Sequence, residues 1–221
     1  MSSLRGKVAL VTGAGKGVGR AAALALGQAG ARVVVVDVNP DAAQHTADAI
    51  TQAGGTALVQ VADVANKMAV QTMLYTVLDQ WERIDVVVNA AHVAPGSAAL
   101  KMDEWEWNRT LDVNLKGAFL VAQTAARAMR ALSDPERPLS DSRRAKGEGK
   151  KASGGLILNI LRPAEASAHA GVRAAREGLL GLTATLQAEW AGFGVRVEVV
   201  EAGERAAEEI VRRCEVVISH W

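Results

Sequence analysis

Short apolar runs alternate with longer segments of helical character along most of the chain. The short runs are rich in valine, isoleucine and leucine, which is typical of strands buried on both faces of a parallel sheet. In the longer segments, apolar positions recur at helical spacing. The pattern predicts strands at residues 7–11, 31–36, 57–61, 84–89, 156–160, 195–200 and 215–219. It predicts helices at residues 17–29, 40–53, 67–81, 105–131, 172–190 and 204–213.

This alternation predicts an α/β fold in which helices cover both faces of a seven-stranded parallel sheet. A chain of 221 residues suits one such domain, residues 1–221, and it contains no internal repeat. Residues 132–153 break the pattern, because they carry two prolines, two glycines and many charges. Such a segment cannot bury an apolar face, so we expect a charged surface insertion there.

A glycine-rich turn joins the first predicted strand to the first predicted helix. Glycines let the backbone approach a pyrophosphate, and the helix N-terminus supplies free N–H groups. The second strand ends at Asp37, about 20 residues further on, where a carboxylate can accept the hydroxyls of an adenosine ribose. The segment therefore predicts a Rossmann dinucleotide site. Its turn consists of Gly13, Gly15, Lys16, Gly17, Val18 and Gly19.

Asp37 also bears on the choice of cofactor. Its carboxylate would repel a 2′-phosphate, so NAD(H) is favoured over NADP(H). Lys16 is the opposing signal, because a base beside the turn can pair with such a phosphate. We interpret Lys16 as a solvated loop residue and predict NAD(H).

The composition indicates which kinds of partner and which cellular compartment we expect. Twenty-five basic residues against 24 acidic ones give a formal net charge of +1, so no global field recruits nucleic acid or an anionic membrane. The single cysteine, Cys214, excludes an internal disulfide and suits a reducing compartment. No apolar run approaches the ~20 residues of a membrane helix, and no signal-peptide pattern precedes the first strand. We expect a cytoplasmic protein without a metal site.

Further motifs follow the later strands. Asp63 and Val64 come after the third strand, and Asn89, Ala90 and Ala91 close the fourth. With the glycine turn and Asn114 in the segment DVNLKG, they make the chain resemble the short-chain dehydrogenase/reductase family over nearly its whole length. The resemblance implies that the aspartate–valine pair holds adenine and that the asparagine of DVNLKG supports the active site. It also implies assembly into a dimer or tetramer, or with an active homologue.

The catalytic positions depart from the family pattern. In the family a tyrosine carries the hydroxyl proton, a lysine four residues on lowers the pKa of that tyrosine, and a serine orients the substrate oxygen. The resemblance places Arg162, Val172 and Arg176 at the serine, tyrosine and lysine positions, respectively. Valine has no titratable proton and arginine stays protonated, so we expect no ordinary hydride transfer. The only tyrosine, Tyr75, lies in the predicted helix 67–81, where we expect it to pack.

Three functions remain open at this point. The favoured one is an NAD(H)-binding, regulatory or structural subunit without the family's usual activity. The alternative is an NAD-dependent oxidoreductase for a small carbonyl or alcohol, with His169 or His92 as the acid. The third is an oligomerisation partner of an active homologue. The family's long substrate-covering segment after the sixth strand is shortened here, since a helical pattern follows residue 203 at once, and the sequence names no substrate.

Overall fold

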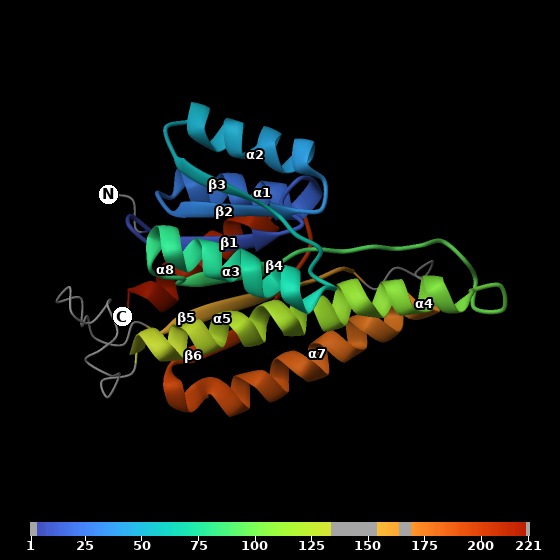
Figure 1. Ribbon diagram of the computed structural model, residues 1–221. Helices are drawn as coiled ribbons and strands as arrows, with labels where there is room; N and C mark the ends of the chain where they lie inside the picture. Colours follow the sequence, from blue (N-terminus) through green and yellow to red (C-terminus); the bar gives the residue numbers. More distant parts are fainter. Residues whose placement is uncertain (1–3, 134–153, 164–168, 220–221) are drawn as a thin grey trace.

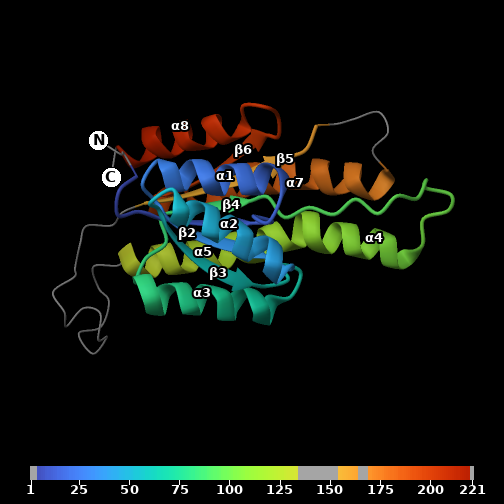
Figure 2. The same cartoon turned by 90° about the horizontal axis from the view of Figure 1, so that it is seen from above.

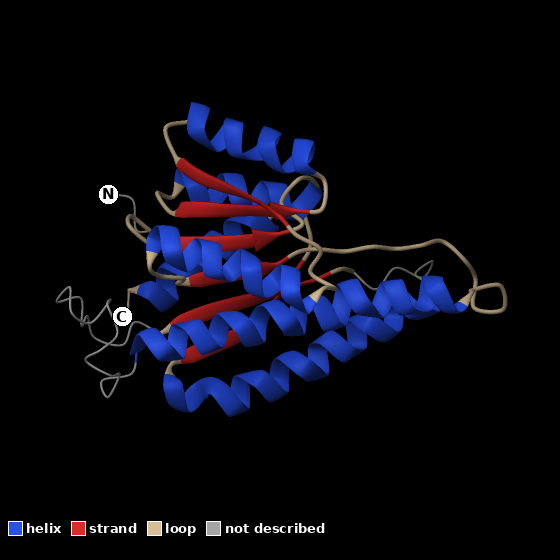
Figure 3. Cartoon of the chain, in the orientation of Figure 1, coloured by secondary structure: helices blue, strands red, loops and turns tan. Residues whose placement is uncertain are grey.

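A six-stranded parallel sheet forms the centre of the computed structural model, which describes residues 4–133, 154–163 and 169–219. The strand order is β3-β2-β1-β4-β5-β6, and β1 pairs in parallel with both β2 and β4. Helices lie on both sides of the strands (Figure 1 and Figure 3). The strands are β1 (Val8–Thr12), β2 (Arg32–Asp37), β3 (Thr56–Val61), β4 (Val86–Asn89), β5 (Gly155–Leu161) and β6 (Val195–Glu201).

Two apolar layers enclose the sheet, because successive strand residues face opposite sides. One layer joins the sheet to α1, α2 and α8, and the other joins it to α3, α5 and α7. Figure 2 shows α1 and α8 on the side opposite α3 and α5. The helices are α1 (Gly17–Gln28), α2 (Pro40–Gln52), α3 (Lys67–Trp81), α4 (Glu104–Leu111), α5 (Ala118–Ser133), α7 (Ala170–Trp190) and α8 (Ala206–Ile218). The described residues also form two short helical turns, η1 (Asp112–Gly117) and η2 (Ala191–Phe193).

The predicted seventh strand is wrong for the described part of the chain. Residues 215–218 continue α8, whose buried positions Ile210, Cys214, Val217 and Ile218 recur at helical spacing. No glycine or proline separates this valine-rich end from the preceding helix, so the helical pattern extends through it. A short apolar run of this kind fits either a strand or a buried helix by periodicity alone.

The long helix predicted at 105–131 is instead two α-helices, α4 and α5, joined by the π-helical turn η1. The charged insertion predicted at 132–153 lies outside the described residues apart from its first two positions, which end α5. Within the described ranges, no helix has both the length and the apolarity needed to cross a bilayer.

The strand order reverses between β1 and β4, since the chain goes from β1 outward to β3 and returns to the other side of β1. Ligands of open parallel sheets bind at the carboxyl ends of the strands beside such a reversal. The fold therefore directs attention to the loops that follow β1, β2, β4 and β5.

Candidate functional site

The glycine turn after β1 has a backbone that other residues could not adopt without strain. Gly13 has φ +63°, and a Cβ atom there would lie 2.7 Å from the Ala91 Cα. Gly17 has φ +55°, with no atom within 4 Å of a Cβ position, so the entrance to α1 is open. The turn thus packs closely against the end of β4 while leaving the helix N-terminus accessible, as a pyrophosphate site requires.

The carboxylate of Asp37 is held at the end of β2. Its Oδ2 accepts a hydrogen bond from the Gly15 backbone N–H at 2.9 Å, and its Oδ1 accepts one from Asn39 N–H at 3.0 Å. An ionised carboxylate has about four lone-pair positions, so two remain for ribose hydroxyls. The predicted ribose acceptor therefore has both the place and the free capacity for that role.

Asp63 follows β3 and lines the same cavity as Asp37. Its Oδ1 accepts from Ala65 N–H at 3.0 Å, and its Oδ2 pairs with Arg109 Nη1 at 2.9 Å. Arg109 comes from α4, and no sequence motif pointed to it. Its pairing means that an adenine amino group would share the Asp63 carboxylate with a guanidinium.

A cavity of about 350 Å³ connects these groups, which is within the range of ligand pockets. Most predicted cofactor residues meet here. Gly13, Lys16, Asp37, Asp63, Val64, Ala90 and Ala91 line the cavity, together with His92, Arg109 and Arg162. Gly15, Gly17, Val18 and Gly19 shape the adjoining turn and the start of α1 rather than the cavity wall.

The end of β4 is tied to its neighbours by buried amides and a hydroxyl. Thr12 Oγ1 accepts from the N–H groups of Ala90 and Ala91 at 3.1 and 3.2 Å. Asn89 Nδ2 donates to Asn159 Oδ1 at 2.9 Å. These bonds tie the end of β4 to β1 and β5 at the floor of the cleft.

Asn114 lies in η1, and its amide pairs at both ends with the backbone of one residue. Its Oδ1 accepts from Val93 N–H and its Nδ2 donates to Val93 O, both at 2.8 Å. The wide π-helical turn brings this side chain to the loop after β4. Asn114 therefore positions the loop that carries His92.

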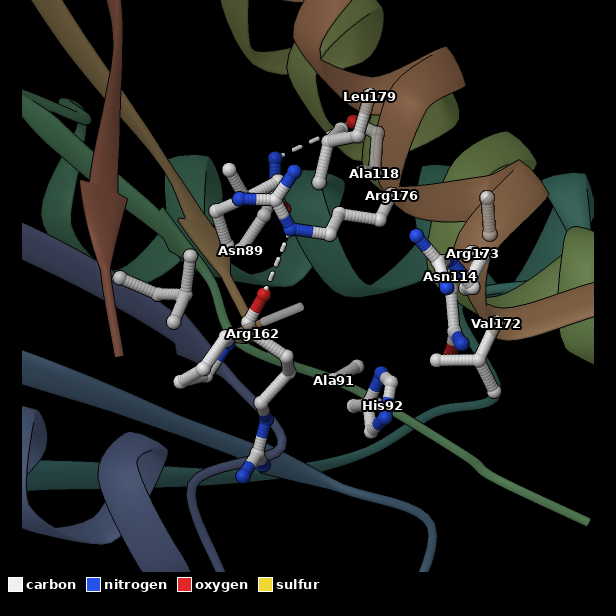
Figure 4. Close-up of a pocket in the computed structure, with 14 residues that line it drawn as sticks. Asn89, Ala91, His92, Asn114, Ala118, Arg162, Val172, Arg173, Arg176 and Leu179 are labelled. Atoms are coloured by element: carbon white, nitrogen blue, oxygen red, sulfur yellow. Dashed lines mark hydrogen bonds between the residues drawn. The ribbon is translucent and has the colours of Figure 1, made fainter. Parts of the chain in front are cut away.

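A second, smaller cavity lies beside the first and holds only about 30 Å³. Figure 4 shows it between the ends of β4 and β5 and the start of α7. Its lining includes Asn89, His92, Asn114, Arg162, Val172 and Arg176. The described residues that line it include no tyrosine, serine or lysine.

Arg176 crosses this cavity with its guanidinium committed to protein acceptors. Nε donates to the Arg162 carbonyl at 2.9 Å, Nη1 pairs with Glu177 at 2.8 Å, and Nη2 pairs with Glu201 at 3.1 Å (Figure 4 shows the first bond). The side chain thereby links α7 to the ends of β5 and β6.

The two histidines proposed as acids differ in position. His92 lines both cavities, and burial, followed by the nearby charge of Arg162, lowers its pKa from 6.5 to about 4. The imidazole is therefore neutral at pH 7 and carries no proton to donate as an imidazolium. His169 precedes α7 and lines neither cavity.

Tyr75 does not belong to this region. Its side chain on α3 is 72% exposed and lines neither cavity, so the expectation that it packs is wrong. The helix places it on the solvent side because the buried positions of α3 are Val70, Met73, Leu74 and Val77.

Taken together, the sheet order, the glycine turn and the carboxylate at the end of β2 define a Rossmann protein with a nucleotide cleft. The residues present fit an adenosine diphosphate group in the larger cavity. They fit a nicotinamide with its ribose poorly, because Arg176 and the small second cavity leave space for ordered water rather than a ring.

The comparisons identify the family. Residues 7–208 match the family model for short chain dehydrogenases. The chain is 34% identical over 200 residues to D-threitol dehydrogenase of Mycolicibacterium smegmatis, covering 89% of this chain and 69% of that protein. The chain belongs to the short-chain dehydrogenase/reductase family, whose named relatives are oxidoreductases.

Solved structures agree with this assignment. A metagenomic short-chain oxidoreductase in complex with NADP is similar with a TM-score of 0.82 and 30% identity, covering 96% of this chain and 92% of that one. A short chain dehydrogenase from Mycobacterium avium is similar with a TM-score of 0.83 and 29% identity, covering 100% and 79%. The predicted α/β fold, a parallel sheet with helices on both faces, is therefore confirmed as a Rossmann fold.

Proposed function

We propose that this chain binds NAD(H) through its adenosine diphosphate half and does not perform the family's ordinary hydride transfer. The observation that carries the proposal is the contrast between the two cavities. Asp37 offers free acceptor capacity in the larger one, whereas Val172 and a committed Arg176 face the smaller one. Because neither side chain can relay a proton, the protein acts as a nucleotide-binding, regulatory or oligomerisation subunit.

The preference for NAD(H) over NADP(H) belongs to the same proposal. The Asp37 carboxylate lies where it accepts from Gly15 N–H, and a 2′-phosphate beside it would meet a like charge. Lys16, which is exposed at the cavity wall, supports the opposite preference, as does the NADP complex of one structural relative. For the choice between NAD(H) and NADP(H) we give the Asp37 carboxylate more weight than Lys16, because two backbone donors hold the carboxylate in place.

An oxidoreductase that uses another acid is the second candidate. The names of the relatives favour it, because the chain is similar to enzymes called dehydrogenases and reductases. His92 is the residue with access to the cleft, but its lowered pKa leaves it neutral at pH 7. A neutral imidazole is a weak donor for a carbonyl oxygen, so this candidate ranks second.

The deciding experiment separates binding from chemistry. The full chain is titrated with NADH and with NADPH while fluorescence of its five tryptophans is followed, and ketones and alcohols are screened for turnover. We expect saturable binding that is tighter for NADH, with no turnover above buffer. Turnover by the unmodified chain that is lost in His92→Gln would favour the second candidate instead.

A triple replacement tests whether the absence of hydride transfer is caused by the side chains at the family's catalytic positions. We expect Arg162→Ser, Val172→Tyr and Arg176→Lys, combined, to gain measurable NADH oxidation. The matched control combines Arg162→Ser, Val172→Phe and Arg176→Lys, since phenylalanine supplies the ring without the hydroxyl. Equal activity in the two triple variants would contradict a role for the phenol.

Assembly is part of the proposal through the family resemblance. The exposed indoles of Trp105 and Trp107 lie on α4, beside α7, on the helices that pack between subunits in the family. We expect a dimer or tetramer by light scattering at micromolar concentration. A monomer at that concentration would contradict the oligomerisation role.

A further inference from the structure

Arg162 is the described cation that borders both cavities. It follows β5, and its backbone carbonyl accepts the Arg176 Nε hydrogen bond at 2.9 Å. In Figure 4 its side chain extends away from Arg176, so the two guanidinium groups lie on opposite sides of that carbonyl. Its own guanidinium makes no hydrogen bond or ion pair with another residue in the described ranges.

The other cations of the larger cavity are placed differently. Arg109 is paired with Asp63 at the adenine end, and Lys16 is exposed on the glycine turn. Arg162 is only partly exposed and approaches from the β5 side, where the cavity borders the smaller one. Its charge reaches into the cleft, because it contributes to the lowered pKa of His92. An anion in this part of the cleft would therefore meet a guanidinium that has no partner among the described residues.

A ligand that continues past the second phosphate meets an obstruction. Beyond Arg162 the cavity holds about 30 Å³, and Arg176 is fixed there by three acceptors. A nicotinamide riboside would have to displace these contacts or remain in solvent. A ligand that ends at its second phosphate avoids that cost and keeps a charge for Arg162.

We propose that the cleft selects an adenine nucleotide that ends in a diphosphate, ADP, over NAD⁺ or NADH, and that the Arg162 guanidinium binds the terminal phosphate. This inference rests on the proposed nucleotide-binding function and narrows its ligand. It assigns to the residue at the family's serine position a binding role that replaces substrate orientation. Guanidinium and phosphate match in geometry, because the planar fork can donate two parallel hydrogen bonds.

The test is isothermal titration calorimetry of the full chain with ADP, AMP, NAD⁺ and NADH, which needs no enzymatic readout. We expect ADP to bind at least about threefold more tightly than NAD⁺ or NADH. Arg162→Gln is expected to weaken ADP about tenfold or more and AMP less than twofold, since AMP lacks the second phosphate. Arg162→Lys is expected to recover part of the ADP affinity, because it restores the charge without the fork.

Arg173→Gln is the matched control. It removes an exposed arginine that lines only the smaller cavity, so ADP affinity is expected to stay within twofold. Thermal unfolding of each variant identifies any loss of folding. NAD⁺ or NADH binding as tightly as ADP, or an unchanged ADP affinity in a folded Arg162→Gln variant, would overturn the inference and leave the proposed function standing. Failure of every nucleotide to bind would contradict the proposed function itself.

Discussion

The cleft consists of the larger cavity, here called the open half, and the smaller cavity, here called the closed half. Polar side chains in the two halves differ in what they bind. On the β1–β2 side, Asp37 is held by backbone N–H groups and retains acceptor capacity toward an open cavity. On the β4–β5 side, Asn114 bonds to Val93 through both ends of its amide, and Arg176 donates to three protein acceptors. A polar residue bound to its own chain stabilises the fold but offers little to a ligand. The comparison teaches that a familiar motif is informative for binding only where its donors and acceptors remain free.

The largest expected effect on stability and nucleotide binding comes from adding a side chain to the glycine turn of the open half. Gly13→Ala places a Cβ atom 2.7 Å from the Ala91 Cα at a residue with φ +63°. The left-handed backbone and the overlap together should lower the free energy of unfolding by about 3 kcal/mol and abolish nucleotide binding. Chemical denaturation and NADH titration measure the two effects.

Gly181→Ala is the control for that change. Gly181 lies within α7, and no atom lies within 4 Å of its Cβ position. Because alanine favours a helix over glycine, the variant should gain about 0.5 to 1 kcal/mol of stability and bind as before. A Gly13→Ala variant as stable as Gly181→Ala would contradict the close packing of the glycine turn.

The next largest effect is the pH dependence of stability that His92 causes. His92 titrates near 6.5 when unfolded and near 4 when folded, so its contribution to stability is complete above pH 6.5 and is lost as pH falls toward 4. A shift of this size, discounted for partial exposure, corresponds to about 2 kcal/mol. The measurement is urea denaturation at several pH values between 7 and 4, where the stability advantage over His92→Gln should shrink. Parallel pH profiles for the two proteins would show that His92 is not desolvated.

Removing the side chain that fills the second cavity should sharpen the comparison. Arg176→Met loses the bond to the Arg162 carbonyl and two ion pairs to exposed glutamates, Glu177 and Glu201. Exposed pairs contribute little, so we expect a loss of about 1 to 2 kcal/mol. NADH affinity should rise a few-fold relative to ADP, because space opens for the nicotinamide.

Arg173→Met serves as the control here, since Arg173 is exposed on the same helix and borders the same cavity. We expect its stability and its NADH-to-ADP affinity ratio to match those of the unmodified chain. If Arg176→Met left that ratio unchanged, Arg176 would not be what obstructs the nicotinamide half.

Local patterns predicted where the residues around β1 and β2 lie relative to one another. A strand, a glycine turn, a helix and a second strand ending in Asp37 are consecutive in sequence, so their spacing fixes their placement. The alternation of apolar runs likewise predicted the six observed strands. The seventh was wrong because the run at 215–219 is too short for its period to distinguish a strand from a helix.

The closed half could not be predicted in the same way. The family resemblance predicts which residues stand at the catalytic positions, but spacing along the chain could not indicate that Arg176 on α7 pairs with Glu201 on β6. Nor did any motif indicate that Arg109 pairs with Asp63, 46 positions away. Such contacts depend on side-chain direction across the folded sheet, which spacing along the chain does not encode.

The smallest expected effect tests how the open half chooses its cofactor. Asp37→Asn removes the negative charge while its amide oxygen can still accept from Gly15 N–H. We expect NADH affinity to fall about tenfold, since a neutral amide is a weaker acceptor for ribose hydroxyls, and NADPH affinity to rise because the repulsion is gone. Paired titrations with NADH and NADPH give the ratio directly, and Asp41→Asn on the exposed start of α2 controls for a general change in charge. An unchanged ratio in Asp37→Asn would mean that Lys16, rather than the carboxylate, determines which nucleotide the glycine turn accepts.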